Sequence, residues 1–269
     1  MSDAAPQQPQ PQPLLDVSGV SISFGGLKAV SDFRLALPKG GLHGLIGPNG
    51  AGKTTVFNLI TGVYQADSGD ISLGGRRLNG LRPNRIAAAG LARTFQNIRL
   101  FGELSVLDNV RIAAHHRTKS STLSALLRTA GWFGEERAIT EEAHALLEIF
   151  GLSDRADEQA RNLPYGDQRR LEIARALATR PKVLLLDEPA AGMNSGEKVE
   201  LSGLIRSIRD RFGLTILLIE HDMGLVMSIC EHITVLDHGG VSAAGDPAAV
   251  QQGPAVIEAY LGTDDGEGG

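Results

Sequence analysis

A glycine-rich turn between a predicted strand and a predicted helix constrains the fold of this chain more than any other feature. The apolar run Leu42–Ile46 predicts the strand, and Lys53–Ile60 predicts the helix. The turn and the start of the helix fit the pattern G-x-x-x-x-G-K-[ST] with one further threonine: Gly47, Pro48, Asn49, Gly50, Ala51, Gly52, Lys53, Thr54 and Thr55.

Glycines let successive backbone N–H groups turn inward around phosphate oxygens, and a helix N-terminus adds the positive end of its dipole. The turn is therefore predicted to bind a nucleoside polyphosphate, with Lys53 at the β- and γ-phosphates and Thr54 as a ligand of Mg²⁺. An ordinary glycine-rich turn before a helix is the alternative, and the fixed spacing between strand and helix argues against it.

Two adjacent carboxylates form the second chemical signal. The apolar run Val183–Leu186 predicts a buried strand, and Asp187 and Glu188 follow it directly. Ligands of open α/β sheets bind at the carboxyl edge, where these two side chains are expected. Asp187 is predicted to act on Mg²⁺ through water, and Glu188 to polarise the attacking water as a general base. A strand that ends in two solvated acids is common on its own, so this prediction depends on the turn upstream.

Short apolar runs alternate with helical patterns along most of the chain, which predicts an α/β fold around a mostly parallel sheet. The runs Val183–Leu186 and Leu214–Ile219 are continuous, as expected of strands that are covered on both faces. The part before about Gly50 is β-rich instead. Residues 97–162 contain helical patterns and predict an inserted helical lobe, in which one helix face carries Ala143, Leu146, Leu147 and Phe150.

A later helix carries apolar residues at the same spacing and is predicted to begin at a cap formed by Asn194 and Glu197. The proline- and glutamine-rich residues 1–13 and the glycine-rich, acidic residues 263–269 are predicted to be disordered tails. Residues 14–262 are left as the folded domain.

Composition excludes some classes of protein. The 269 residues carry a formal net charge of -5 with no concentrated basic surface, which argues against a nucleic-acid binder. Cys230 is the single cysteine, so no internal disulfide can form, and a reducing cytoplasm is expected. No apolar run is long enough to span a bilayer, and the first residues lack the pattern of a secretory signal. If the protein works at a membrane, a partner is expected to hold it there.

The segment Leu163–Leu177, with the sequence LPYGDQRRLEIARAL, resembles the signature motif of ATP-binding-cassette (ABC) ATPases and precedes the Asp-Glu strand by the interval usual in that family. Three single residues also resemble family positions. Gln96 resembles the glutamine that senses the γ-phosphate and Mg²⁺, His221 resembles the switch histidine, and Phe24 resembles the aromatic residue that stacks on adenine. Taken alone, Gln96 would more simply be a surface amide, His221 a capping histidine before a helix and Phe24 a core aromatic. The features occur in the family's order over essentially everything between the two tails.

The resemblance implies an α/β P-loop NTPase of ABC type, with an N-terminal antiparallel β subdomain beside the parallel core and an inserted α-helical subdomain. It implies hydrolysis of ATP with Mg²⁺, catalysed by Glu188, His221, Gln96 and Lys53, with the metal held by Thr54, Gln96 and Asp187. It also implies head-to-tail pairing with a second ABC ATPase, in which Tyr165, Gly166 and Asp167 cover the partner's ATP. Two membrane permeases would dock near Gln96–Phe101, which places the chain on the cytoplasmic face of the plasma membrane.

Within the family, five phrases are similar to the subgroup that energises import of branched-chain amino acids: FQNIRLF, YGDQRRLEIARAL, DEPAAGMN, IEHDM and IEAYLG. An extracellular or periplasmic substrate-binding protein would then be an indirect partner. The cargo is bound by other subunits, so the same motor coupled to urea, another amino acid or a lipid is an alternative. A soluble clamp acting on chromosomes or ribosomes would need coiled-coil insertions, a second cassette or a basic surface. A non-catalytic nucleotide-binding regulator is the third alternative.

The chain departs from the family pattern at four positions. Pro164 replaces the signature serine, Tyr165 the first glycine and Asp167 the glutamine, and Asn194 stands where an aspartate usually follows the Asp-Glu strand. Because Pro164 offers neither a hydroxyl nor an N–H donor, a weaker trans ATP site is expected, which favours a heterodimer with unequal sites over a homodimer.

Other polar residues are given simpler interpretations. His115 and His116 lack further ligands at suitable spacing and are assigned to a solvated helix face, so no metal besides Mg²⁺ is expected. The basic residues of the helical lobe are assigned to a solvated face, with contact to a membrane partner as the alternative: Arg111, Arg117, Lys119 and Arg128.

Overall fold

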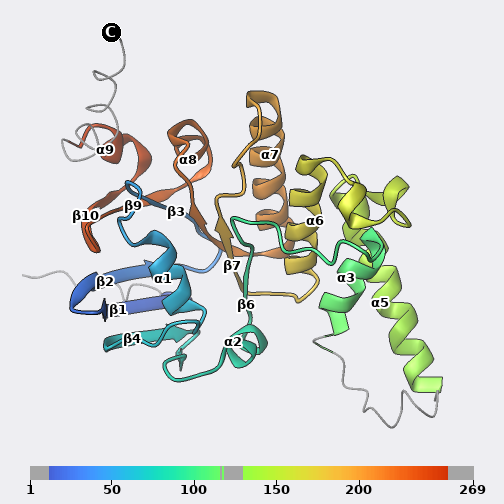
Figure 1. Ribbon diagram of the computed structural model, residues 1–269, viewed down its shortest axis with the longest axis horizontal. Helices are drawn as coiled ribbons and strands as arrows, with labels where there is room; N and C mark the ends of the chain where they lie inside the picture. The colour runs from blue at the N-terminus through green and yellow to red at the C-terminus, as the bar shows by residue number, and fades with distance from the viewer. Residues whose placement is uncertain (1–11, 116, 118–129, 254–269) are drawn as a thin grey trace, which may run out of the picture.

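The computed structural model describes residues 12–115, 117 and 130–253, and these residues form two sheets flanked by helices (Figure 1). Of the predicted tails, only Gln12 and Pro13 fall within the described residues. His116, Lys119, Arg128 and the closing IEAYLG phrase also lie outside them.

The smaller sheet is antiparallel and has the strand order β2-β1-β4-β5. Its strands are β1 (Leu15–Phe24), β2 (Leu27–Leu37), β4 (Ser68–Leu73) and β5 (Arg76–Arg77). Apolar side chains of β1 and β2 alternate with exposed ones and pack inward. The sequence placed the β-rich part before Gly50, whereas β4 and β5 come from beyond the first helix; β4 pairs with β1, and β5 pairs with β4.

The larger sheet has the order β10-β9-β3-β8-β7-β6 and is parallel except for β10, which is antiparallel to β9. Its strands are β3 (Leu42–Ile46), β6 (Leu91–Arg93), β7 (Val183–Asp187), β8 (Thr215–Ile219), β9 (His232–Asp237) and β10 (Gly240–Gly245). All residues of β3, β7 and β8 are buried, which explains their continuous apolar sequences. The predicted mostly parallel core is confirmed, and β3, β8 and β7 end side by side at one edge.

Helices cover both faces of the larger sheet. They are α1 (Lys53–Ile60), α2 (Pro83–Ala89), α7 (Ser195–Phe212), α8 (Met223–Ile229) and α9 (Pro247–Gln251). The predicted helix 53–60 is confirmed as α1. The predicted cap of α7 is confirmed too, because the Asn194 side chain accepts from the Glu197 N–H while the Glu197 carboxylate accepts from the Asn194 N–H.

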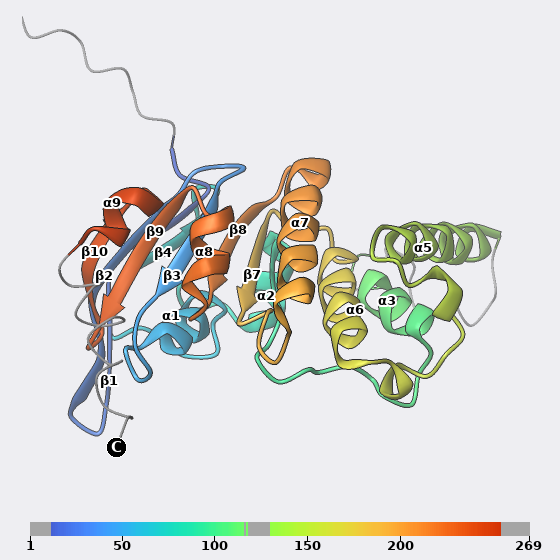
Figure 2. The same ribbon diagram turned by 90° about the horizontal axis from the view of Figure 1, so that it is seen from above.

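A group of helices lies at the end of the molecule away from the smaller sheet, with α7 between the two (Figure 2). It contains α3 (Val106–His115), α5 (Ala130–Ile149), the 3₁₀ turns Ser153–Arg155 and Ala160–Asn162, and α6 (Tyr165–Leu177). In the described part of residues 97–162, the only β pairing is the isolated bridge between Ser105 and Gln159. The predicted helix face of Ala143, Leu146, Leu147 and Phe150 is buried in a core shared by α3, α6 and the sheet.

Two basic residues of this group lie half-buried in ion pairs with acids of α5 rather than on a solvated face. Arg111 pairs with Glu136, and Arg117 pairs with Glu142. Among the described residues, no helix combines the length and the apolar character that crossing a membrane requires.

Candidate functional site

The carboxyl edge of the parallel strands carries most of the predicted site residues. The loop after β3, the loop after β6, the residue after β7 and the residues after β8 meet around a cavity of about 430 Å³. Its lining residues are Gly47, Pro48, Asn49, Gln96, Glu188 and His221. Four chain segments that are distant in sequence are therefore brought together.

The glycine loop needs glycine for steric reasons at two positions. Gly47 and Gly52 have φ of 153° and 103°, and a Cβ would lie 2.1 Å from the Leu236 carbonyl oxygen at the first and 2.7 Å from the Ala29 carbonyl oxygen at the second. Gly52 is also the N-cap of α1, and no side chain caps this helix. The first N–H groups of α1 thus remain available to an anion at the mouth of the loop.

Lys53 is buried and curls back over the loop that precedes it. Its Nζ donates to the carbonyl oxygens of Gly47 and Pro48, at 2.6 and 3.0 Å. Burial lowers the pKa of Lys53, while the nearby carboxylates of Glu188 and Asp187 act in the opposite direction. The ammonium group is thus held beside the cavity with two acids close enough to affect its charge.

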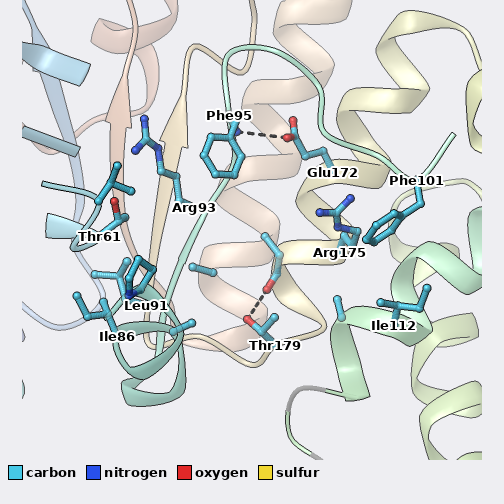
Figure 3. Close-up of a pocket in the computed structure, with 16 residues that line it drawn as sticks. Thr61, Ile86, Leu91, Arg93, Phe95, Phe101, Ile112, Glu172, Arg175 and Thr179 are labelled. Atoms are coloured by element: carbon cyan, nitrogen blue, oxygen red, sulfur yellow. Dashed lines mark hydrogen bonds between the residues drawn. The ribbon is translucent and has the colours of Figure 1, made fainter. Parts of the chain in front are cut away.

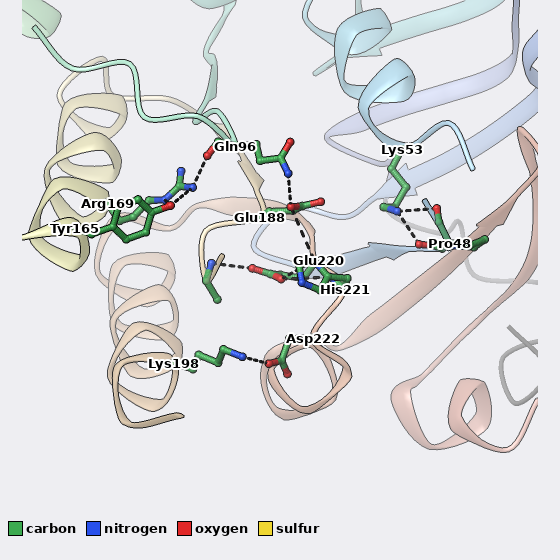
Figure 4. A network of polar contacts seen from close by, with 12 residues as sticks. Pro48, Lys53, Gln96, Tyr165, Arg169, Glu188, Lys198, Glu220, His221 and Asp222 are labelled. Carbon is green, nitrogen blue, oxygen red and sulfur yellow. Dashed lines mark hydrogen bonds and ion pairs between the residues drawn. The ribbon is translucent and has the colours of Figure 1, made fainter. Parts of the chain in front are cut away.

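Glu188 stands at the centre of the polar network in Figure 4. Its φ is 47°, a strained value for a residue with a side chain, and its N–H donates to the Ile219 carbonyl oxygen. Gln96 Nε2 donates to Glu188 Oε2 at 2.7 Å, and His221 Nδ1 lies 3.9 Å from the same oxygen. Three of the four predicted catalytic residues, Gln96, Glu188 and His221, therefore meet at Glu188 Oε2.

Asp187 forms a buried ion pair that the sequence analysis missed. Arg93 Nη2 donates to Asp187 Oδ2 at 2.7 Å, and the two side chains are 7% and 5% exposed. Arg93 Nη1 also donates to Asn58 Oδ1 of α1, and the guanidinium lies 5.3 Å from the Phe57 ring centre. The signal in the sequence was a charged residue directly after the apolar pair of Leu91 and Ala92, in a segment too short to be recognised as a strand.

Glu220 was also missed. Its side chain is almost fully buried, where Oε1 accepts from the Ala190 N–H at 2.8 Å and Oε2 accepts from the His221 N–H. Burial raises the pKa of this carboxyl group, against hydrogen bonds that lower it. Glu220 ties the loop after Glu188 to the loop that carries His221.

The residues present fit a Mg²⁺ ion that takes few ligands from the protein and most of them from water and phosphate. Among the described residues there is no cluster of three or more His, Cys, Asp and Glu side chains that could hold a metal ion. Magnesium usually takes one or two protein oxygens and completes its shell with water and phosphate. Thr54, exposed at the start of α1, and Asp187, at the end of β7, offer that small set, with the Gln96 amide near them.

Four predicted residues lie apart from this cavity. Phe24 sits at the tip of the β1–β2 hairpin and packs edge-on against Tyr64, with ring centres 5.1 Å apart. Tyr165, Gly166 and Asp167 open α6 instead. Their predicted contacts with adenine and with a partner's ATP stay predictions.

A strand, a glycine loop and a helix at the carboxyl edge of a parallel sheet, with buried-strand acids beside them, define a phosphate-loop nucleotide-binding protein. A family model described as ABC transporter matches residues 30–191. The chain belongs to this family of ABC transporter ATPases.

Individual relatives agree with this assignment over almost the whole chain. A high-affinity branched-chain amino acid transport ATP-binding protein LivG of Salmonella typhimurium is 49% identical over 93% of this chain and 98% of its own length. The corresponding protein BraF of Pseudomonas aeruginosa is 47% identical over the same shares. The solved ADP conformation of an ATP-binding cassette of an ABC transporter has a TM-score of 0.81 and 31% identity, covering 93% of this chain and 98% of that one.

Proposed function

We propose that this chain is the ATP-hydrolysing subunit of an importer of branched-chain amino acids and that it works with Mg²⁺ at the cytoplasmic face of the membrane. The observation that carries the cargo assignment is the 49% identity to a LivG protein over 98% of that protein's length. The assembly would contain a second ABC ATPase, two permeases and, indirectly, a substrate-binding protein.

The chemistry follows from the residues at the sheet edge. The N–H groups of the glycine loop and Lys53 bind the terminal phosphates, and Mg²⁺, when bound, neutralises charge that develops on them. Glu188 accepts the proton of the attacking water as general base. The Gln96 amide fixes the orientation of the Glu188 carboxylate. His221 lies beside Glu188, where an imidazole can hold a proton near the γ-phosphate.

A groove between the sheet and the helical lobe supports the proposed docking of the permeases. It encloses about 340 Å³ and is bordered by α2, β6, α3 and α6 (Figure 3). Phe101 and Ile112 expose apolar surface there, and Arg93 and Phe95 form its inner wall. An amphipathic helix of a membrane partner is the occupant that suits a short apolar groove of this kind.

The test combines turnover with transport. Purified wild-type protein should hydrolyse MgATP, and Glu188→Gln should keep nucleotide affinity while turnover falls by roughly 100-fold or more, since the general base is removed. In cells that lack the chromosomal copy, the wild-type gene should restore leucine uptake and Glu188→Gln should not.

Uptake that is restored for urea but not for leucine would assign another cargo. Full turnover in Glu188→Gln would refute the role of Glu188 as base. Co-purification from membranes would identify the partners, and recovery of soluble proteins alone would contradict the transporter assembly.

A further inference from the structure

Tyr165 occupies a position where the family motif has glycine, and its side chain contacts its own subunit. The residue is the first of α6, after Pro164, whose side chain makes no cap hydrogen bond. Its hydroxyl accepts from Nε and Nη2 of Arg169, one helical turn later, at 3.2 and 2.8 Å. The residue is 45% exposed and its ring lies against Gly192, where an added Cβ would be 3.4 Å from Cε1 of Tyr165. Tyr165 therefore joins the start of α6 to the loop after Glu188.

Arg169 carries this contact into the loop that bears Gln96. The residue is 2% exposed, and besides Tyr165 its guanidinium donates to the carbonyl oxygens of Phe95, at 2.7 Å, and Gln96. A further partner is Glu172, at 3.3 Å, whose carboxylate also accepts from the Phe95 N–H. All parts of the guanidinium are thus directed to an acceptor, as burial of a charge requires.

The peptide groups around Phe95 are consequently held on both sides by α6. Glu172 holds the N–H of Phe95, and Arg169 holds the two carbonyl oxygens that follow. The next side chain, that of Gln96, donates to Glu188. Figure 4 shows this series of contacts from Tyr165 through Arg169 and Gln96 to Glu188.

We propose that Tyr165 and Arg169 are positioning residues that hold the Gln96 side chain against Glu188. Because both residues belong to α6, a movement of α6 would move Gln96 relative to Glu188. This inference rests on the proposed function, because Glu188 is its end point. When a partner subunit presses on the exposed Tyr165 face, the shift reaches Glu188 through the side chains of Tyr165 and Arg169, the backbone of Phe95 and Gln96, and finally the Gln96 side chain. Tyrosine in place of glycine then adds the contact with Arg169, at the surface proposed to face the ATP of the partner subunit.

Two conservative substitutions separate the parts of this link. Tyr165→Phe removes the hydroxyl and keeps the ring, and Arg169→Lys keeps the charge and loses the planar fork. Arg209→Lys is the matched control, because Arg209 also binds two acceptors, Asp210 and Glu231, but at the far end of α7. Thermal unfolding of each variant establishes that it is folded.

The first measurement is hydrogen exchange of the nucleotide-free protein. The Phe95 amide donates to Glu172, and it should exchange about fivefold faster in Arg169→Lys, because loss of roughly one hydrogen bond to the neighbouring carbonyl oxygens loosens this segment. It should also exchange faster in Tyr165→Phe than in wild type. Arg209→Lys should match wild type. Unchanged exchange in both variants would overturn the inference, whether or not the protein hydrolyses ATP.

The second measurement is a double-mutant cycle on hydrolysis. Tyr165→Phe should lower kcat about fivefold and leave the KM for MgATP within about twofold, because the hydroxyl that is removed binds Arg169 of its own subunit, while the tyrosine ring, the glycine loop and Lys53 are kept. In a Gln96→Ala background, Tyr165→Phe should have no further effect on kcat. Independent, additive losses would show a general structural role and refute positioning through Gln96. Failure of the wild-type protein to hydrolyse ATP would instead refute the proposed function, and the exchange data would still decide this inference.

Discussion

At the scale of single residues, the buried pair of Arg93 and Asp187 determines how Asp187, the acid proposed to bind Mg²⁺, is held. Removing one member of a buried pair leaves the other charge without a partner, which is far more costly than losing an exposed pair. Asp187 follows Leu186 at the end of β7 and cannot turn to solvent, since the strand is buried throughout. Arg93 thus stabilises the fold while it orients the acid.

Arg93→Met should lower the free energy of unfolding by about 3–5 kcal/mol. Arg34→Met is the control, because Arg34 and Asp32 pair at 2.9 Å with both side chains 68% exposed, and its loss should stay below about 1 kcal/mol. Urea denaturation of both variants measures the difference. Equal losses would show that the Arg93 pair is no more important than a surface contact.

At the scale of elements, the local parts of the site were predictable and the contacts between distant segments were not. The strand β3 and helix α1 begin and end where the apolar run, the glycines and Lys53 place them. The short strand β5 has two exposed arginines and pairs with β4, so its sequence carries no apolar pattern. The pairing of β4 with β1, which are separated by β2, β3 and α1 in the sequence, is set by the whole sheet rather than by local preference.

Contacts between distant segments also explain which residues around the site the sequence did not predict. The spacing of Tyr165 and Arg169 is visible in the sequence as an i, i+4 pair, but the carbonyl oxygens of Phe95 and Gln96 that Arg169 binds belong to a distant loop. Backbone acceptors leave no trace in residue identity. Side-chain chemistry therefore predicted which groups gather at the sheet edge, and not what holds them in place.

The cap of α7 gives a prediction at this scale. Asn194→Ala should lower the free energy of unfolding by about 1 kcal/mol, because the N–H of Glu197 loses its acceptor, whereas Asn194→Asp should retain most of it. Ser195→Ala, at the next residue, is the control and should change stability by less than about 0.5 kcal/mol. Chemical denaturation compares the three variants. A full loss in Asn194→Asp would mean that the amide group itself is needed.

At the scale of the whole molecule, stability depends on a histidine in the middle of the larger sheet. His43 of β3 lies opposite His232 of β9, with ring centres 5.2 Å apart. His43 is buried and its Nδ1 has no hydrogen-bond partner among the described residues. Burial, and then His232, lower the pKa of His43 to about 4, although Glu231 acts in the opposite direction.

The direction of the pH effect follows from this lowered pKa. Between the unfolded pKa of about 6.5 and the folded value of about 4, the unfolded chain binds the proton and the folded protein does not, so the free energy of unfolding falls as the pH falls. Above pH 7 both states are neutral and His43 adds no pH dependence. By pH 4 the loss due to this residue should reach about 3 kcal/mol.

His43→Leu isolates that contribution, because the other titrating groups remain. The difference in unfolding free energy between wild type and His43→Leu should be constant above pH 7 and should change by about 3 kcal/mol in favour of the variant toward pH 4. His238→Leu is the control for the general effect of replacing a histidine by leucine, at an exposed position. A difference for His43→Leu that stays flat down to pH 4 would mean that the folded protein accepts the proton at His43 as readily as the unfolded chain does. Water would then reach His43 between β3 and β9, and any loss of unfolding free energy in acid would come from other titrating groups.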